Sequence, residues 1–452
     1  MQTDTCMRVS VNGDRNAVEL LRDLIRFDTS NPPGAEAPMI RHVESLLDAH
    51  GIETTVLARD PARPNLIARI PGARDAPPLL LYGHADVVPV VDQQWSHDPF
   101  GGTVSDGAVW GRGALDMKGG IAMMLSALLR VQREEVVPAG DLILAIVSDE
   151  EGDGGCGAEW LVEHHAAHFE GVRHAIGEFG GFSMELGGTR FYPIQVSEKQ
   201  KCWLRASIHG DGGHGALIHR NTAMGALGKF LTTLTEVRLP VHLTKPSEQM
   251  ILALARGMGA KRWALYGLLQ PRLADRVLRF MGDDGAAFAP LLRHTANPTV
   301  VHGGSATNVI PSKVDVEVDG RLLPGYRPAD LIGELRAVVG REVDIEVIRF
   351  DPGPPVIDMT LFETLARVIR EADPAGVPIP MLLSGVTDAR FFARLGIQTY
   401  GFLPMRLPRD FAFPKLLHAA DERIPIAALD FGANTIFRLL QRYGRGRTAV
   451  TR

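Results

Sequence analysis

Hydrophobic positions along the first third of the chain follow two different periods. Apolar side chains recur at helical spacing, which predicts amphipathic helices, in the segments 15–27, 36–51 and 119–131. Other segments are apolar almost throughout, namely NLIARI (65–70), PPLLLYGH (77–84) and DLILAIVSD (141–149). Runs of this kind are typical of strands that are buried on both faces. Their alternation with helices predicts an α/β sheet that is covered on both sides.

The pattern changes near residue 198. From there, strands that alternate between polar and apolar side chains are interleaved with two helices, in the order β-α-β-β-α-β of the ferredoxin-like fold. The strands are expected at 201–210, 299–304, 314–323 and 343–350, and the helices at 221–234 and 328–340. The α/β layer then resumes with a helix at 360–372 and a strand at 397–403.

Residues 241–298 are rich in Leu, Arg and Met at helical spacing, and we interpret them as a helical insertion in the small domain. The chain thus divides into a first catalytic part (1–197), a small domain (198–352) and a second catalytic part (353–452). No internal repeat is recognisable.

Composition limits the class of protein. The chain has 452 residues, of which 45% are hydrophobic and 22% charged, so it has ample material for a globular core. Lys and Arg total 48 against 53 Asp and Glu, and the formal net charge of -5 argues against nucleic-acid binding. Three cysteines without a CxxC pair argue against a disulfide framework and against a thiolate zinc site.

Targeting and membrane segments are not recognisable in the sequence. The amino terminus lacks the basic-then-apolar order of a signal peptide. The longest apolar runs are far shorter than the roughly 20 residues of a membrane-spanning helix. We therefore expect a cytoplasmic protein in a reducing setting, with neither a membrane nor a nucleic acid as partner.

Acidic residues and histidines follow the apolar strands, at the end of an α/β sheet where ligands bind. His84 and Asp86 come after the second strand, and their i, i+2 spacing lets Asp86 accept the second ring N–H of His84. Asp116 lies in a glycine-flanked loop that opens onto a helix. Taken singly, these residues also fit a hydrogen-bonded histidine and a helix N-cap.

A third group, Asp149, Glu150, Glu151 and Asp153, follows the strand at 141–149. Such a group is usually solvated, but adjacent Glu150 and Glu151 repel each other unless a cation lies beside them. One of the two carboxylates then binds metal while the other works as a base.

Glu178, His418 and Glu422 add further candidates. Together these positions supply two histidines and several carboxylates but no cysteine. This ligand set suits zinc, with manganese or cobalt as substitutes.

Six motifs, in order along the chain, resemble those of the di-zinc aminoacylase and carboxypeptidase family. They are GHADVVPV, WSHDPFGG, GRGALDMKGG, SDEEG, GEFGG and HAADER. The resemblance covers nearly the whole chain and is closest to the carboxypeptidase S branch. It implies a zinc-peptidase α/β catalytic domain, with a mixed central sheet flanked by helices, and an inserted ferredoxin-like lid or dimerisation domain.

The resemblance also implies residue roles in the catalytic domain. One zinc site matches His84, Asp116 and Glu178, and the other matches Asp116, Glu151 and His418, so that Asp116 bridges two Zn²⁺ ions. Asp86 matches the aspartate that orients the first histidine. Glu150 matches the general base that takes a proton from the metal-bridging water and passes it to the leaving nitrogen. A cis peptide after Asp116 is implied as well.

In the small domain the resemblance implies substrate contacts. His214 matches a histidine that reaches the active site of the partner subunit and stabilises the oxyanion, although His219 lies close to it in sequence. Asn308 matches an asparagine that lines the cleft. Arg321 matches the arginine that holds the free carboxylate of the substrate, and its alternative is a surface arginine on an alternating strand. A homodimer is therefore expected.

Three departures from the family pattern bear on the substrate. Val386 replaces a glycine near the carboxylate pocket, and Gly177 replaces the acidic neighbour of Glu178. The insertion at 241–298 is longer than in compact relatives. It either shapes the cleft for a longer acyl group or replaces or enlarges a dimer contact, and we favour the structural interpretation.

The expected protein is a zinc amidohydrolase that cleaves an amide next to a free carboxylate in N-acyl amino acids, dipeptides or short peptides. A biosynthetic deacylase, of the desuccinylase or acetylornithine deacetylase type, is the alternative within enzymes. A catalytically silent metal- or peptide-binding relative is the alternative outside them, and it is disfavoured because every catalytic position is filled. A nucleotide-binding protein is disfavoured because GRGALDMKGG lacks the Walker and Rossmann spacings.

Overall fold

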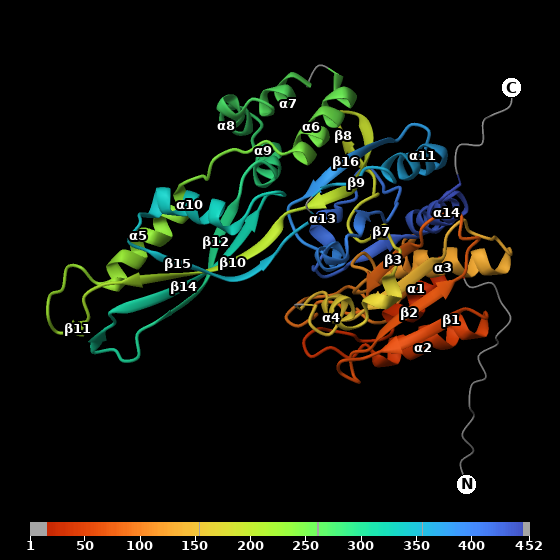
Figure 1. The fold of residues 1–452 in the computed structure, drawn as a ribbon, viewed down its shortest axis with the longest axis horizontal. Coiled ribbons are helices and arrows are strands. Elements are labelled where there is room, and N and C mark those ends of the chain that lie inside the picture. The colour runs from red at the N-terminus through yellow and green to blue at the C-terminus, as the bar shows by residue number, and fades with distance from the viewer. Residues whose placement is uncertain (1–15, 153, 260–261, 355, 446–452) are drawn as a thin grey trace, which may run out of the picture.

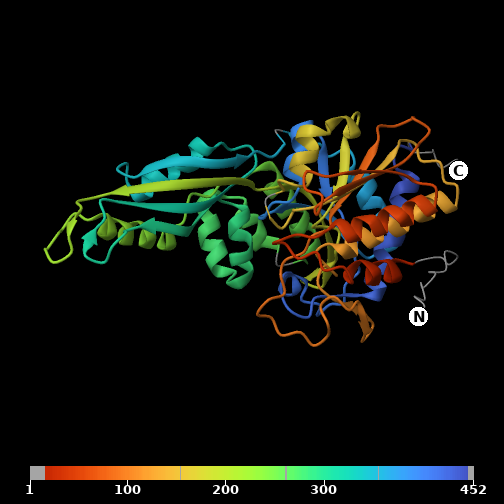
Figure 2. The same ribbon diagram turned by 90° about the horizontal axis from the view of Figure 1, so that it is seen from below.

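The computed structural model describes residues 16–152, 154–259, 262–354 and 356–445. In these ranges the chain forms a broad α/β domain and a narrower domain that projects from it (Figure 1 and Figure 2). Cys6 and Asp153 lie outside the described residues. No helix in the described part of the chain is both long and apolar enough to span a bilayer.

A nine-stranded mixed sheet forms the centre of the larger domain, as far as the chain is described. Its order is β1-β2-β6-β3-β7-β17-β9-β16, and β8 pairs with β9. The strands are β1 (Glu53–Leu57), β2 (Asn65–Ile70), β3 (Leu79–His84), β6 (Leu142–Val147), β7 (His174–Gly177), β8 (Met184–Leu186), β9 (Thr189–Glu198), β16 (Val377–Leu383) and β17 (Gln398–Gly401). The predicted α/β class with a mixed central sheet is confirmed.

Helices cover both faces of this sheet because its central strands are apolar on both sides. In β3, Leu79 and Leu81 pack on one face, while Leu80 and Tyr82 pack on the other. The first face is covered by α1 (Ala17–Ile25), α2 (Ala37–Ala49), α3 (Lys118–Arg133), α11 (Phe362–Ala372) and α14 (Ile426–Arg442). The second is covered by α4 (Ala158–His164) and α12 (Ala389–Phe392). The uninterrupted apolar run predicted this two-sided burial.

Three strands that contain prolines escaped prediction in whole or in part, and one of them, β9 (TRFYPIQVSE), lies inside the larger sheet. β16, which reads VPIPMLL, was not predicted, and β12 (Thr295–Gly303) begins four residues before the predicted 299. Both β16 and β12 lie at the edge of their sheet. An edge strand tolerates proline because the missing N–H need not pair with a neighbour.

The small domain has the predicted ferredoxin-like arrangement. Its sheet has the order β12-β14-β10-β15 and is antiparallel throughout. The remaining strands are β10 (Gln200–His209), β14 (Lys313–Leu322) and β15 (Asp344–Asp351), and α5 (Ala223–Glu236) and α10 (Pro328–Val339) pack on one face. The far end carries a short pair formed by β11 (Gly213–His214) and β13 (Val309–Ile310) (Figure 1).

Helices occupy most of the described residues between 245 and 288, within the segment 241–298 that is predicted as a helical insertion in the small domain. These helices are α6 (Lys245–Gly257), α7 (Arg262–Leu268), α8 (Pro271–Phe280) and α9 (Asp283–Phe288). They share a buried cluster with Phe191 of β9 and Ile379 of β16. The insertion therefore rests on the edge of the catalytic sheet (Figure 1).

Shorter elements complete the larger domain. A three-stranded sheet consists of β4 (Thr103–Ser105), β5 (Ala108–Trp110) and β18 (Arg423–Pro425). Single turns of helix are found at α13 (Phe413–Leu416) and in the 3₁₀ segments Ala166–Phe169, Ala289–Leu291 and Ala393–Leu395.

A buried histidine lies between the helices of the insertion and β12 of the small domain. His294 is 1% exposed and accepts the backbone N–H of Leu323 at its Nδ1, at 3.1 Å. Burial first, and then the charges of His242 and Lys199, lower its pKa to about 4. Because the unfolded chain takes up this proton near pH 6.5, the contribution of His294 to stability is complete above that pH and is lost towards pH 4.

We predict that a His294→Asn variant is less sensitive to acid than the wild type. Asparagine retains an acceptor for the N–H of Leu323 but does not titrate. Between pH 7 and pH 4 the free energy of unfolding of the wild type should fall by about 3 kcal/mol more than that of the variant. Urea unfolding at several pH values measures this difference, and parallel profiles would contradict the prediction.

Candidate metal centre

Two parallel strands and one loop bring the first group of ligands together. His84 is the last residue of β3, Glu178 follows the neighbouring β7, and Asp116 lies just before α3. The Nε2 atom of His84 lies 3.0 Å from Asp116 Oδ1 and 3.3 Å from Glu178 Oε2. Because the carboxyl ends of parallel neighbours meet at one edge, residues that follow β3 and β7 converge there.

A second group shares the carboxylate of Asp116. His418 Nε2 lies 3.1 Å from Asp116 Oδ2 and 3.3 Å from Glu151 Oε1. Glu151 follows β6, the other parallel neighbour of β3. In each group the ligand atoms all lie within 4.8 Å of one another. Asp116 therefore presents one oxygen to each group.

The donor atoms fit divalent metal ions. Each group offers one imidazole nitrogen and two carboxylates, which is a set that zinc accepts. The buried Oε1 atom of Glu151 makes no hydrogen bond of good geometry among the described residues, although His418 Nε2 lies 3.3 Å from it. A bound cation would satisfy that oxygen and would neutralise carboxylates that otherwise repel one another.

Asp86 connects the first histidine to the loop that carries Glu150 and Glu151. The nearest partner of His84 Nδ1 is the backbone oxygen of Asp86 at 3.0 Å, and the carboxylate is farther away at 3.6 Å. A proton on Nδ1 that is donated to this carbonyl leaves the lone pair of Nε2 free for a metal. The Asp86 carboxylate instead accepts the backbone N–H groups of Glu150, at 3.1 Å, and Glu151, at 3.0 Å.

Glu422, which the sequence offered as a candidate ligand, anchors the Asp116 loop. Its carboxylate accepts the backbone N–H of Leu115 at 2.7 Å and that of Asp116 at 3.1 Å. It also pairs with Arg112 at 2.7 Å, and both side chains are buried. The Asp116–Met117 peptide is cis, as the resemblance implied.

Glu150 lies beside the two groups without belonging to either. Burial, and then the negative charge of Glu178, raise its pKa well above its ordinary value. Because Glu150 precedes the ligand Glu151 and belongs to neither ligand group, its carboxylate is free to act as a proton acceptor beside both.

A supporting network behind the site was not predicted. Arg63 donates to Glu36 and to Asp149, each at 2.8 Å, and Asn31 donates to Asp86 at 2.8 Å and to Asp149 at 3.1 Å. These residues come from segments that are far apart in the chain, so no local spacing marks them.

A second buried group beside the site was missed as well. Glu198 at the end of β9 accepts the N–H of Thr387 at 3.0 Å, and Thr387 follows Val386. Burial raises the pKa of Glu198 to about 8 and that of neighbouring Asp388 to about 7. The sequence marks Val386, next to Thr387, but it does not mark the partner of this segment on β9.

The predicted substrate residues of the small domain do not join the metal ligands within one chain. His214 lies on β11 and Asn308 precedes β13, at the far end of the small domain (Figure 1). Both residues are exposed, and Gly215 donates its N–H to the backbone oxygen of Asn308 at 2.8 Å. Arg321 on β14 is paired with Asp319 of the same strand at 2.8 Å.

Comparison with known proteins agrees with this architecture. Residues 80–442 match the model of peptidase family M20/M25/M40, and the chain belongs to this family. One structural neighbour, the YXEP protein of Bacillus subtilis, is described as a dinuclear metal-binding peptidase of the M20 family; it has a TM-score of 0.58 and 15% identity, with coverage of 94% of this chain and 96% of its own. The chain is thus a metallopeptidase-family hydrolase.

Relatives within the family carry different substrate names. The human N-fatty-acyl-amino acid synthase/hydrolase PM20D1 is 28% identical over 80% of this chain and 74% of its own length. A succinyl-diaminopimelate desuccinylase of Cereibacter sphaeroides is 29% identical over 94% of this chain and 98% of its own. An M20 metallo-carboxypeptidase of Sulfolobus solfataricus has the same fold, with a TM-score of 0.69, 17% identity and coverage of 95% and 99%.

We predict that Glu422→Gln weakens both the fold and the metal centre. The change leaves the buried guanidinium of Arg112 without its charge partner, which should cost about 3–5 kcal/mol of stability. It also loosens the Asp116 loop, and metal affinity should fall by about 10- to 100-fold.

Thermal unfolding and competition with a chromogenic chelator measure the two effects. Glu363→Gln is the control, because the Glu363 side chain is 60% exposed and pairs with Arg370 on the surface of α11. This control should change stability by less than about 0.5 kcal/mol. Equal behaviour of the two variants would show that Glu422 does not hold the loop.

Proposed function

We propose that this protein hydrolyses an amide bond next to a free carboxylate, with N-acyl amino acids, dipeptides or short peptides as substrates. The observation that carries the proposal is Asp116, whose two oxygens face two separate histidine–carboxylate groups beside Glu150. Zinc is the proposed metal in both groups, with manganese or cobalt as substitutes. When bound, the two ions supply Lewis-acid chemistry, which polarises the amide carbonyl and lowers the pKa of the attacking water.

The residues of the chain have separate tasks in this reaction. Glu150 accepts the proton of the attacking water and delivers it to the leaving nitrogen. Asp86 holds the backbone of Glu150 and Glu151 and fixes the ring of His84. Glu422 holds the loop of Asp116. The proposed base, Glu150, and one of the proposed metal ligands, Glu151, are thereby neighbours in one loop.

Substrate contacts are assigned to the small domain and to a homodimer. Arg321 would hold the free carboxylate of the substrate after its ion pair with Asp319 breaks. The planar guanidinium group suits this task because it can donate two parallel hydrogen bonds to a carboxylate. His214 and Asn308 would act in the cleft of the partner copy, with His214 stabilising the oxyanion. Their exposure, and their place at the far end of the small domain, support an action across subunits. The unpaired thiols of Cys156 and Cys202 are compatible with the proposed cytoplasmic location.

A biosynthetic deacylase is the second candidate. The desuccinylase relative aligns over 94% of this chain, and its identity of 29% is similar to that of the N-fatty-acyl-amino acid hydrolase, at 28%. By name, the two relatives act on a succinyl and on a fatty-acyl derivative, so a comparison of these acyl groups as substrates distinguishes the two candidates.

We expect Glu150→Gln to bind metal like the wild type and to lose turnover. The glutamine is nearly isosteric but does not accept the proton, so kcat should fall by about 10²- to 10⁴-fold. Metal content by atomic emission and turnover of an N-acyl amino acid are measured on the same preparation. Glu363→Gln serves again as the surface control. Retention of full activity would exclude Glu150 as the base.

The proposed bond preference is tested with paired substrates. Release of amino acids is measured for N-acyl amino acids and dipeptides, each beside its carboxyl-amidated form, with zinc-loaded and chelated protein. Release should be sensitive to chelator and limited to the free carboxylates, and Arg321→Lys should raise KM for these substrates while leaving kcat nearly unchanged. Equal cleavage of the amidated forms would reject the carboxylate clamp. No release from any substrate would reject the proposed function.

A further inference from the structure

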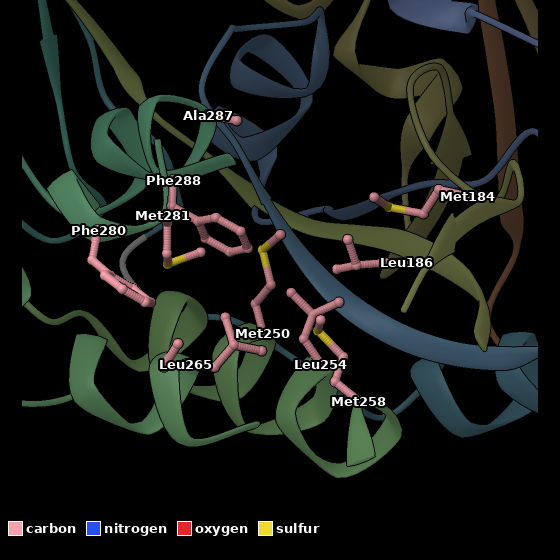
Figure 3. Close-up of a pocket in the computed structure, with 11 residues that line it drawn as sticks. Met184, Leu186, Met250, Leu254, Met258, Leu265, Phe280, Met281, Ala287 and Phe288 are labelled. Carbon is pink, nitrogen blue, oxygen red and sulfur yellow. The ribbon is translucent and has the colours of Figure 1, made fainter. Parts of the chain in front are cut away.

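An apolar pocket lies between the helical insertion and the β8–β9 hairpin. Its volume is about 510 Å³, within the range of pockets that bind small molecules. Figure 3 shows side chains of α6, of the α8–α9 segment and of β8 arranged around it. The lining consists of Met184, Leu186, Met250, Leu254, Met258, Ala264, Leu265, Phe280, Met281, Ala287 and Phe288.

The hairpin and α6 are held together at the wall of this pocket. Thr189 donates its hydroxyl to the backbone oxygen of Gly257 at 2.7 Å. The ring of Phe191 lies so close to Gly257 that an added Cβ would come within 2.5 Å of it. Because only glycine fits there, α6 approaches β9 closely, and its Met250, Leu254 and Met258 form one side of the pocket (Figure 3).

The residues that line the pocket determine which kind of ligand it can bind. None of the eleven side chains carries a hydroxyl, an amide or a charge, so a polar group that entered would lose its hydrogen bonds to water without replacement. Four of the side chains are methionines, which are flexible and adjust to an irregular or mobile apolar ligand. These properties suit an unbranched hydrocarbon chain better than a peptide.

The mouth of the pocket is incompletely covered. Phe280 contributes to the lining and is nevertheless 87% exposed, and Met184 at the opposite side is 38% exposed. Large apolar side chains that remain in water around a preformed pocket are typical of a site that a ligand covers.

The chain leads from a metal ligand to this pocket within a few residues. Glu178 is followed by Phe179 and Phe182, and then by Met184 in the pocket wall. The ring of Phe182 stacks on that of Phe413 with 4.2 Å between centroids, and Phe179 lies 6.1 Å from Phe182. Apolar rings thus accompany the segment that connects the metal centre with the pocket.

We propose that the pocket binds the long unbranched acyl chain of an N-acyl amino acid substrate. This inference rests on the proposed function and specifies its acyl group. The carboxylate of the substrate would face the small domain, its amide the metal centre, and its hydrocarbon tail would follow Phe179 and Phe182 into the insertion. The helices α6–α9 then determine the preference for chain length.

The test compares acyl chains of increasing length on one amino acid. Acetyl, hexanoyl and dodecanoyl derivatives are assayed with the wild type and with Ala264→Phe, which fills the pocket. In the wild type kcat/KM should rise with chain length, by up to about fourfold per buried methylene. In Ala264→Phe, kcat/KM for the dodecanoyl substrate should fall at least tenfold, whereas kcat/KM for the acetyl substrate should be unchanged. Ala329→Phe, on the exposed surface of α10, is the matched control.

A binding measurement provides a readout that does not depend on turnover. The fluorescence of dansyl-undecanoic acid should increase when the probe binds to the wild type or to Ala329→Phe. The affinity of the probe for Ala264→Phe should be at least tenfold weaker. Turnover of acetyl substrates without any gain from longer chains would overturn the inference and leave the proposed function intact. If the affinity of the probe is the same for Ala264→Phe and the wild type, the proposed location of the acyl chain in this pocket is wrong. Probe binding at this pocket in a protein that cleaves no N-acyl amino acid would overturn the assignment to the substrate.

Discussion

The metal centre depends on a single carboxylate whose two oxygens face different histidines. Asp116 lies 3.0 Å from His84 through one oxygen and 3.1 Å from His418 through the other. Its position is fixed from behind, because its own N–H is held by buried Glu422. A displaced Asp116 would separate the two groups of ligands, so the loop, its anchor and the paired Arg112 form one structural unit.

The negative charge of the acidic side chains around Asp116 has to be offset by positive charge. Glu150, Glu151 and Glu178 converge on one edge of the sheet, and burial together with mutual repulsion raises the pKa of Glu150 and of Glu178. Arg63 offsets part of the charge through Glu36 and Asp149. Metal ions at the two ligand groups would offset more of it. The network behind the site therefore keeps these carboxylates close together, and their combined negative charge favours the binding of cations.

The insertion adds an apolar cavity to the α/β domain. A ferredoxin-like domain and an α/β domain are sufficient for a metal centre and a cleft, whereas α6–α9 add an apolar cavity at the sheet edge formed by β9 and β16. An edge strand offers a free side to an added element. The apolar cavity is lined by none of the metal ligands, and it is the place of the proposed acyl site.

The sequence determined the features that repeat locally or follow a strand. Apolar runs predicted the buried strands β3 and β6, and alternation predicted the sheet of the small domain. The metal ligands were accessible because His84, Glu151 and Glu178 each come just after an apolar run, in motifs that resemble a known family. Short-range periodicity is a property of the chain itself and needs no tertiary information.

Only the tertiary structure decided which groups face one another over long separations. It assigned Glu422 to the loop of Asp116, placed the Asp86 carbonyl nearer than its carboxylate to His84, and joined Arg63 to Asp149. It also showed β16, whose prolines obscure the strand pattern. The pocket belongs to this class as well, because its walls come from β8 and from helices dozens of residues later. Contacts of this kind depend on how separate elements pack, and no local spacing in a single sequence encodes them.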